Sequence, residues 1–499
     1  MVFSTRRLVV IAAIPLAAYS AAPARSADEK APAVKALDGA AQQPQPDEPK
    51  PIKLTLHPAR PPAAALEYPL LPRFSEQTPG NAATLYLKAV VIWSEGNKGR
   101  AEVWEKIDRW LTMPLAELPR AEVRAAVASY PGVLHNLRLA AHRDHCDWDP
   151  PIREDEEVFM ILLPEWQDLR IPADLLALKA RLETAEGHPA EALATLQTGY
   201  AMARHVSDCR FLVAGLVGIA LARTMDEQVR TLIESPNCPN LYWSLTALPD
   251  PLVDLRPALD FESEGAFFAF PELRNIDHAE HSAAEWDRIL TRLTQRYAKS
   301  GVAADDKTAL GATILIAGEA IAKLPRAKNE LVAIGRDRKS VDDMPPSQVI
   351  LLDTLLIYRQ ASDEMFKWFN VPYWQGREGF AAFEKRLKTE VREREIIPLA
   401  SVVLPAISNV RKASVRSQRS IALLRTIEAL RFFAAEHDGK LPASLSDIKG
   451  MPVPDDPVSG KPFGYKLSGD TAQLDAPPPA GETWQTLGVR YEITMAGKK

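Results

Sequence analysis

Apolar residues recur at helical spacing over most of the chain, from Leu66 to about residue 410. Positions three or four residues apart lie on one face of a helix, so this spacing predicts helices that each bury one side. Two such groups come first: Leu85, Leu87, Val90, Val91 and Trp93, and then Val103, Trp104, Ile107 and Trp110. Pro131 and Pro346 stand at the start of later segments, where a helix does not need the missing N–H. The pattern predicts a mainly α-helical protein.

Two predicted helices, at residues 173–185 and 189–206, meet at Gly187. Small side chains at Ala180 and Ala192 favour close packing of these helices, and the pair resembles one tetratricopeptide unit. Further helices of similar length are expected at residues 209–234, 283–299, 306–336, 346–369, 378–395 and 399–437. We therefore predict that residues 66–410 form an all-helical domain, an array of antiparallel helical hairpins.

The N-terminal 65 residues do not follow this pattern. Residues 1–27 have a basic start, an apolar run and small residues at two cleavage positions, which are the three parts of a signal peptide. Residues 28–65 are rich in proline and alanine and predict a disordered linker. We expect a periplasmic or otherwise exported protein, and the general secretory route is preferred to the twin-arginine route indicated by Arg6 and Arg7. Membrane contact is expected only through an uncleaved signal segment.

The pattern changes again near residue 411, where a long helix is followed by turns and short alternating stretches. The turns contain DGKLP at residues 438–442 and DPVSGKPF at residues 456–463. This order resembles the globular part of type II secretion major pseudopilins, and it implies a small α+β module over residues 411–499. The long helix of pseudopilins is apolar, whereas here it carries Arg416, Arg419, Arg425 and Arg431. A module without filament assembly is therefore expected.

Three further segments resemble an uncharacterised family of exported planctomycete proteins. They are PNLYWSLTALP at residues 239–249, DLRPAL at residues 254–259 and FKWFNVPYWQ at residues 366–375. The resemblance implies an envelope location and a helical fold, without a known activity.

Composition narrows the functional classes. The formal net charge of −5 gives no reason to expect a nucleic acid partner, because duplex binding needs clustered Lys and Arg. Cys146, Cys209 and Cys238 allow at most one disulfide, and three buried thiols are the alternative. The P-loop, the dinucleotide-binding glycine pattern, H-E-x-x-H and G-x-S-x-G are all absent from the sequence.

One group of residues has the chemistry of a metal site. On a continuous helix, His142 would lie one turn from His145 and Cys146, with Asp149 adding a carboxylate from the following loop. Zinc accepts this set of ligands, and it is the one cofactor that the sequence suggests. Histidines in the last turn of a helix also bond to its free carbonyls, so packing at a helix end is the preferred interpretation.

An aromatic group near residue 370 is a candidate binding surface. Trp368, Phe369, Tyr373 and Trp374 could hold a sugar or a peptide by stacking. Large aromatic residues at a helix end more often anchor helix packing, and we prefer this interpretation.

The sequence favours a non-enzymatic envelope protein that acts as a helical scaffold or binds a protein partner. Two alternatives stay open. One is a metal-dependent hydrolase centred on His142, His145 and Cys146. The other is an accessory component of a secretion or pilus-like system.

Overall fold

A computed structural model describes residues 50–96, 101–149, 168–299 and 309–496. The chain is mainly α-helical with a small β-sheet near its C-terminus, which confirms the predicted fold class. The predicted signal peptide at residues 1–27 lies outside the described residues. Among the described residues, no helix has both the length and the apolar character needed to cross a membrane.

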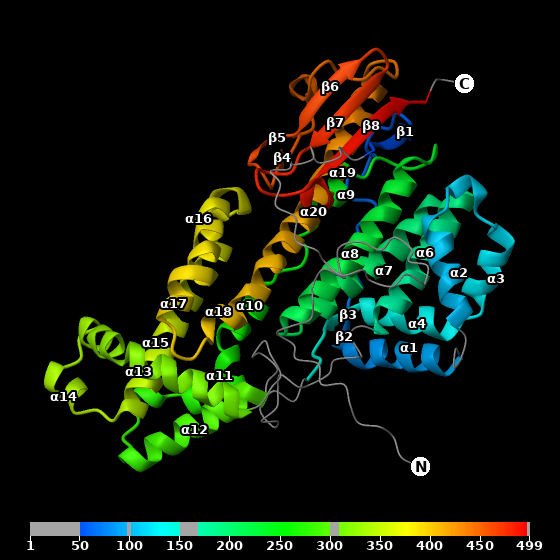
Figure 1. The fold of residues 1–499 in the computed structure, drawn as a ribbon. Helices are drawn as coiled ribbons and strands as arrows, with labels where there is room; N and C mark the ends of the chain where they lie inside the picture. Colours follow the sequence, from blue (N-terminus) through cyan, green and yellow to red (C-terminus); the bar gives the residue numbers. More distant parts are fainter. Residues whose placement is uncertain (1–49, 97–100, 150–167, 300–308, 497–499) are drawn as a thin grey trace, which may run out of the picture.

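The first lobe begins with an array of helices (Figure 1). Gly187, with φ of 82°, takes the left-handed conformation after α6, and Pro189 begins α7, so these two helices form the expected hairpin. α8 packs against both of them. The helices of this lobe are α1 (Ala83–Gly96), α2 (Ala101–Thr112), α3 (Arg120–Ala128), α4 (Pro131–Ala141), α6 (Arg170–Glu186), α7 (Pro189–Ser207), α8 (Leu212–Ile233) and α9 (Tyr242–Thr246).

The second lobe has its own apolar core, built from residues 253–410 with two residues of α8. Pro346 begins α15, as the sequence predicts. The helical region therefore contains two cores, and the first of them also includes residues of the C-terminal region. The helices of the second lobe are α10 (Arg256–Ser263), α11 (Gly265–Ala269), α12 (Ala283–Lys299), α13 (Ala309–Ala333), α14 (Arg338–Asp342), α15 (Pro346–Phe366), α16 (Tyr373–Arg386), α17 (Arg392–Arg394) and α18 (Ala400–Val403).

One long helix, α19 (Ser408–Glu436), runs from the second lobe up to the β-sheet (Figure 1). The sheet has the strand order β1-β8-β7-β6, in which β7 is antiparallel to both of its neighbours. The small module also contains a two-stranded hairpin and a short helix. The elements are β4 (Asp455–Asp456), β5 (Lys461–Pro462), β6 (Gly464–Ser468), β7 (Thr471–Ala476), α20 (Trp484–Leu487) and β8 (Val489–Met495).

Strand β1 (Ile52–Leu56) corrects the predicted linker over residues 28–65, which extends too far. β1 pairs in parallel with β8, and Ile52 lies opposite Tyr491. Leu54 and Leu56 alternate with exposed neighbours and are buried in the first core. This alternation is typical of a strand with one buried face. The prolines on both sides of it led to the prediction of a disordered linker. Residues 28–49 of the predicted linker lie outside the described residues.

Candidate functional site

The predicted metal group does not lie on a helix. α4 ends at Ala141, and the Nδ1 of His142 donates a hydrogen bond to the carbonyl of Arg138 at 2.9 Å, which is the helix-end role. The next residues form β3 (Arg143–His145), which pairs in parallel with β2 (Thr78–Asn81). The helical arrangement that would bring His142, His145 and Cys146 together is therefore wrong.

The four predicted ligands have separate surroundings. The Nδ1 of His145 bonds to the carboxylate of Asp144 at 2.7 Å on the surface, whereas Cys146 is buried in the first core. Asp149 has φ of 42°, and its N–H donates to the side chain of Asp147. Within the described part of the chain, no three His, Cys, Asp or Glu residues form a group that could hold a metal ion. For the predicted ligands, the pairing of β3 with β2 replaces the helical spacing that would have brought His142, His145 and Cys146 together.

The structure instead brings a histidine from α7 to this region. The hydroxyl of Tyr86 lies 2.9 Å from the Nδ1 of His205, and the indole N–H of Trp148 donates to the His205 carbonyl at 2.7 Å. Burial lowers the pKa of His205 to about 4, with the charge of Arg204 acting in the same direction. At neutral pH this imidazole is uncharged, and the ring of Tyr86 packs edge-on against it. No spacing in the sequence points to this contact, because Tyr86, Trp148 and His205 come from distant segments.

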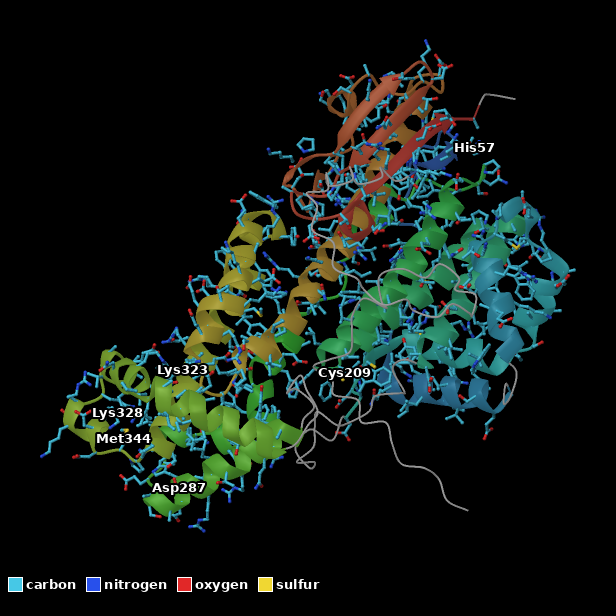
Figure 2. The ribbon with its side chains drawn as sticks, in the orientation of Figure 1. His57, Cys209, Asp287, Lys323, Lys328 and Met344 are labelled. Atoms are coloured by element: carbon cyan, nitrogen blue, oxygen red, sulfur yellow. The ribbon has the colours of Figure 1, made fainter. Side chains whose placement is uncertain are left out.

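The cysteines of the chain are buried and free, which agrees with the buried-thiol alternative. Burial raises the pKa of Cys146, and it raises the pKa of Cys209 and of Cys238 to about 12. Cys209 lies at the connection of α7 to α8 (Figure 2). Because a thiolate is the reactive form, these protonated thiols have the character of core residues.

The predicted aromatic surface lies at the start of α16 and in the turn before it. Trp368 and Phe369 pack against the second core. Tyr373 packs on a small cluster made with α19 and the C-terminal module, and Trp374 lies against Gly460 of that module. Trp374 keeps 46% of its surface exposed. These residues therefore join the second lobe to the C-terminal module, and Trp374 is their exposed edge.

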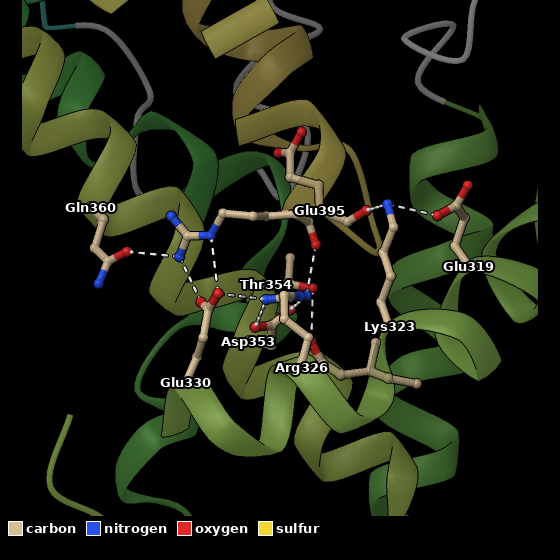
Figure 3. Close-up of polar contacts among 10 residues, drawn as sticks. Glu319, Lys323, Arg326, Glu330, Asp353, Thr354, Gln360 and Glu395 are labelled. Atoms are coloured by element: carbon tan, nitrogen blue, oxygen red, sulfur yellow. Dashed lines mark hydrogen bonds and ion pairs between the residues drawn. The ribbon is translucent and has the colours of Figure 1, made fainter. Parts of the chain in front are cut away.

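A network of charged residues holds α13, α15 and α17 together in the second lobe (Figure 3). Arg326 donates two hydrogen bonds of 2.8 Å to Asp353, which is fully buried, and a third of 2.6 Å to the carbonyl of Arg394. Arg394 in turn donates to both oxygens of Glu330. Each carboxylate here has an arginine partner, so the network stabilises the packing of the three helices.

The neighbouring end of this network also has a structural role (Figure 3). Lys323 of α13 donates to the backbone carbonyl of Glu395 at 2.7 Å and pairs with Glu319. The Glu395 carboxylate accepts the backbone N–H of Ala400 and of Ser401, which fixes the start of α18. Four charged residues of α13 recur at spacings of four, three and four, which is a signal in the sequence that they share one side of the helix. They are Glu319, Lys323, Arg326 and Glu330.

A buried carboxyl group lies inside the first lobe. The hydroxyl of Tyr200 on α7 donates to Asp226 on α8 at 2.6 Å, and Asp226 is only 3% exposed. Burial raises the pKa of Asp226 to about 7, and the Tyr200 bond acts in the opposite direction. The group is a source of pH dependence within the helical array.

We expect Asp226→Asn to reduce the pH dependence of stability. The ordinary pKa of 3.8 applies in the unfolded chain, so only the folded protein keeps this proton between about pH 4 and pH 7. A raised carboxyl pKa stabilises the fold at low pH, and this contribution is lost as the pH rises through that window. Between pH 5 and pH 7, the free energy of unfolding of the parent should fall by about 2 kcal/mol more than that of the variant. Urea unfolding at both pH values measures this, and equal losses in the two proteins would contradict it.

No protein-family model, curated protein or solved structure matches this chain. The tetratricopeptide, pseudopilin and planctomycete resemblances therefore stay predictions.

Proposed function

We propose that this protein is an exported, non-enzymatic scaffold of the cell envelope whose helical array binds a protein partner. The observation that carries the proposal is an exposed apolar strip on α1. Leu87 and Val91 lie one helical turn apart and are 37% and 55% exposed. On the neighbouring α4, Leu139 is 37% exposed. Stacked helices present extended surfaces of this kind to other proteins.

The chemistry of the described residues supports a binding role. The histidines, cysteines and carboxylates discussed above either bond to other protein groups or lie in the core. The hydrolase alternative depends on the convergence of His142, His145 and Cys146, which the fold separates. The proposal that the protein is exported is supported by the signal-peptide pattern of residues 1–27.

The binding surface can be tested with a photo-activated cross-linker in place of Val91 in the native envelope. The cross-linked protein is then purified and its affinity measured for the parent, Val91→Glu and Ala121→Glu. Each variant adds one charge at an exposed position, the first on α1 and the second on α3. We expect Val91→Glu to weaken binding at least about tenfold, because it buries a charge in an apolar contact, and Ala121→Glu to leave it unchanged. Equal affinities for all three proteins would refute the α1 surface.

A role as an accessory of a secretion or pilus-like system is a second candidate. It is favoured by the order of the C-terminal region, in which the long α19 leads into the antiparallel strands β6, β7 and β8. β6 is an edge strand of the sheet, and Lys466 on it is exposed. A cross-linker at Lys466 that captures a secretion component, with none captured at Val91, would favour this candidate over the scaffold.

A further inference from the structure

The second lobe meets the C-terminal module at a small contact that we call the α16 joint. It consists of Tyr373 at the start of α16, Val415 of α19, and Val458 and Leu487 of the module. The last three are 2%, 2% and 1% exposed. This cluster is separate from both large cores, and Trp374 lies beside it with almost half of its surface exposed. The apolar contact that closes the joint is therefore limited.

A buried arginine of α19 lies at this joint without a carboxylate. Arg411 is 5% exposed, and neither of its terminal nitrogens has a hydrogen-bond partner in the described structure. The two other fully buried arginines of α19 differ, because Arg419 pairs with Asp456 and Arg431 pairs with Glu428. The adjacent Lys412 pairs with Glu482, so that carboxylate is already engaged.

Aromatic rings surround the Arg411 guanidinium. Its central carbon lies 5.1 Å from the ring centre of Tyr373, 5.2 Å from that of Phe380 and 5.9 Å from that of Phe369. Gly376 supplies the remaining wall, because an added Cβ there would overlap the guanidinium. Cation–π attraction offsets part of the cost of removing this charge from water. Burial lowers the pKa of Arg411, yet a guanidinium keeps its proton at every physiological pH.

These contacts favour opposite states of the joint. The apolar cluster and the aromatic rings favour the closed joint, whereas the missing carboxylate favours the open one, in which water can reach Arg411. A small contact beside a buried, unpaired charge is the kind of region that opens locally while larger cores persist.

We propose that the α16 joint is a conformational device that opens while both cores stay folded, and that opening exposes the aromatic face of α16 together with Arg411. The open state presents Tyr373 and Trp374 to solvent, while Phe380 stays in the second core. It also frees the second lobe to move relative to the C-terminal module. This inference goes beyond the proposed scaffold role, since it holds whether or not the α1 surface binds a partner.

Hydrogen exchange of the full chain, followed by mass spectrometry, tests the proposal. Peptides covering residues 369–380 should exchange at least about tenfold faster than peptides from α15, which lies in the core of the same lobe. Arg411→Met keeps the length of the side chain and removes the charge, so it should slow exchange at residues 369–380 by about tenfold or more. Arg411→Lys keeps the charge and should leave exchange fast. Arg120→Met, at an exposed position of α3, is the matched control and should change nothing there.

Two results would overturn the proposal that the α16 joint opens locally. One is exchange at residues 369–380 as slow as in α15, which would mean that the joint opens only when the lobe unfolds. The other is unchanged or faster exchange in Arg411→Met, which would assign Arg411 a purely stabilising role. The comparison of peptides within the parent protein decides the first point even if Arg411→Met does not fold.

Discussion

Replacing Asp456 by alanine is expected to lower the free energy of unfolding by about 3 to 5 kcal/mol, the usual cost of removing one partner of a buried ion pair. Arg419 and Asp456 are 1% and 3% exposed. Two hydrogen bonds, of 2.8 Å and 2.5 Å, join them. Asp456 also accepts the N–H of Val458 at 3.0 Å, so the substitution removes a turn contact as well.

The position of this pair explains why its loss should affect the whole module. Arg419 of α19 also donates to the carbonyls of Ala476, Pro477 and Leu487, which lie at the end of β7 and in α20. Without Asp456 the guanidinium stays buried without a compensating charge. Urea unfolding gives the change in free energy, and hydrogen exchange should show loss of protection in β7 and β8. Glu227→Ala removes an exposed ion pair with Arg223 and is the control. A cost for Asp456→Ala no greater than that of the control would contradict the prediction.

Glu428→Ala is expected to have an effect of similar size, about 3 to 5 kcal/mol. Glu428 and Arg431 are both fully buried, with hydrogen bonds of 2.9 Å and 3.0 Å between them. Arg431 also donates to the carbonyls of His57 and Cys238. The pair therefore attaches the segment after β1, and the loop before α9, to α19. His57 lies beside the β-sheet, far from the second lobe (Figure 2).

The measurement for Glu428→Ala is again urea unfolding, together with hydrogen exchange in β1. Glu428→Gln keeps the shape and one acceptor, so it should recover part of the lost stability. The control is Glu436→Ala on the same helix, which removes an exposed ion pair between Glu436 and Arg60. If β1 stayed as protected as in the parent while stability fell, the proposed attachment of the N-terminal segment through Arg431 would be wrong.

The sequence predicted most helices because their signals are local. The spacing of apolar residues, Pro131 and Pro346 at helix starts, and Gly187 at a helix end each depend on neighbours within one or two turns. The α+β character of the C-terminal region was also predictable, since its turns and alternating stretches are short-range features.

The candidate sites were harder to predict, because each depends on contacts between distant segments. Residues 143–145 pair as a strand with residues 78–81, so His142 and His145 do not share a helix. The prediction failed there because helical spacing was extended past the end of α4. The Tyr86 and His205 contact had no sequence signal, as 119 positions separate the two residues.

The sequence by itself determined that most of the chain is helical and which faces of the main helices are apolar, because main-chain hydrogen bonds and side-chain spacing act locally. Only the tertiary structure decided that Leu54 and Leu56 join a sheet made by the opposite end of the chain. It also decided that the buried Arg419 and Arg431 of α19 meet a carboxylate, whereas the buried Arg411 does not. The stability of a buried charge depends on the partners that folding places around it, and these partners come from segments far apart in the sequence.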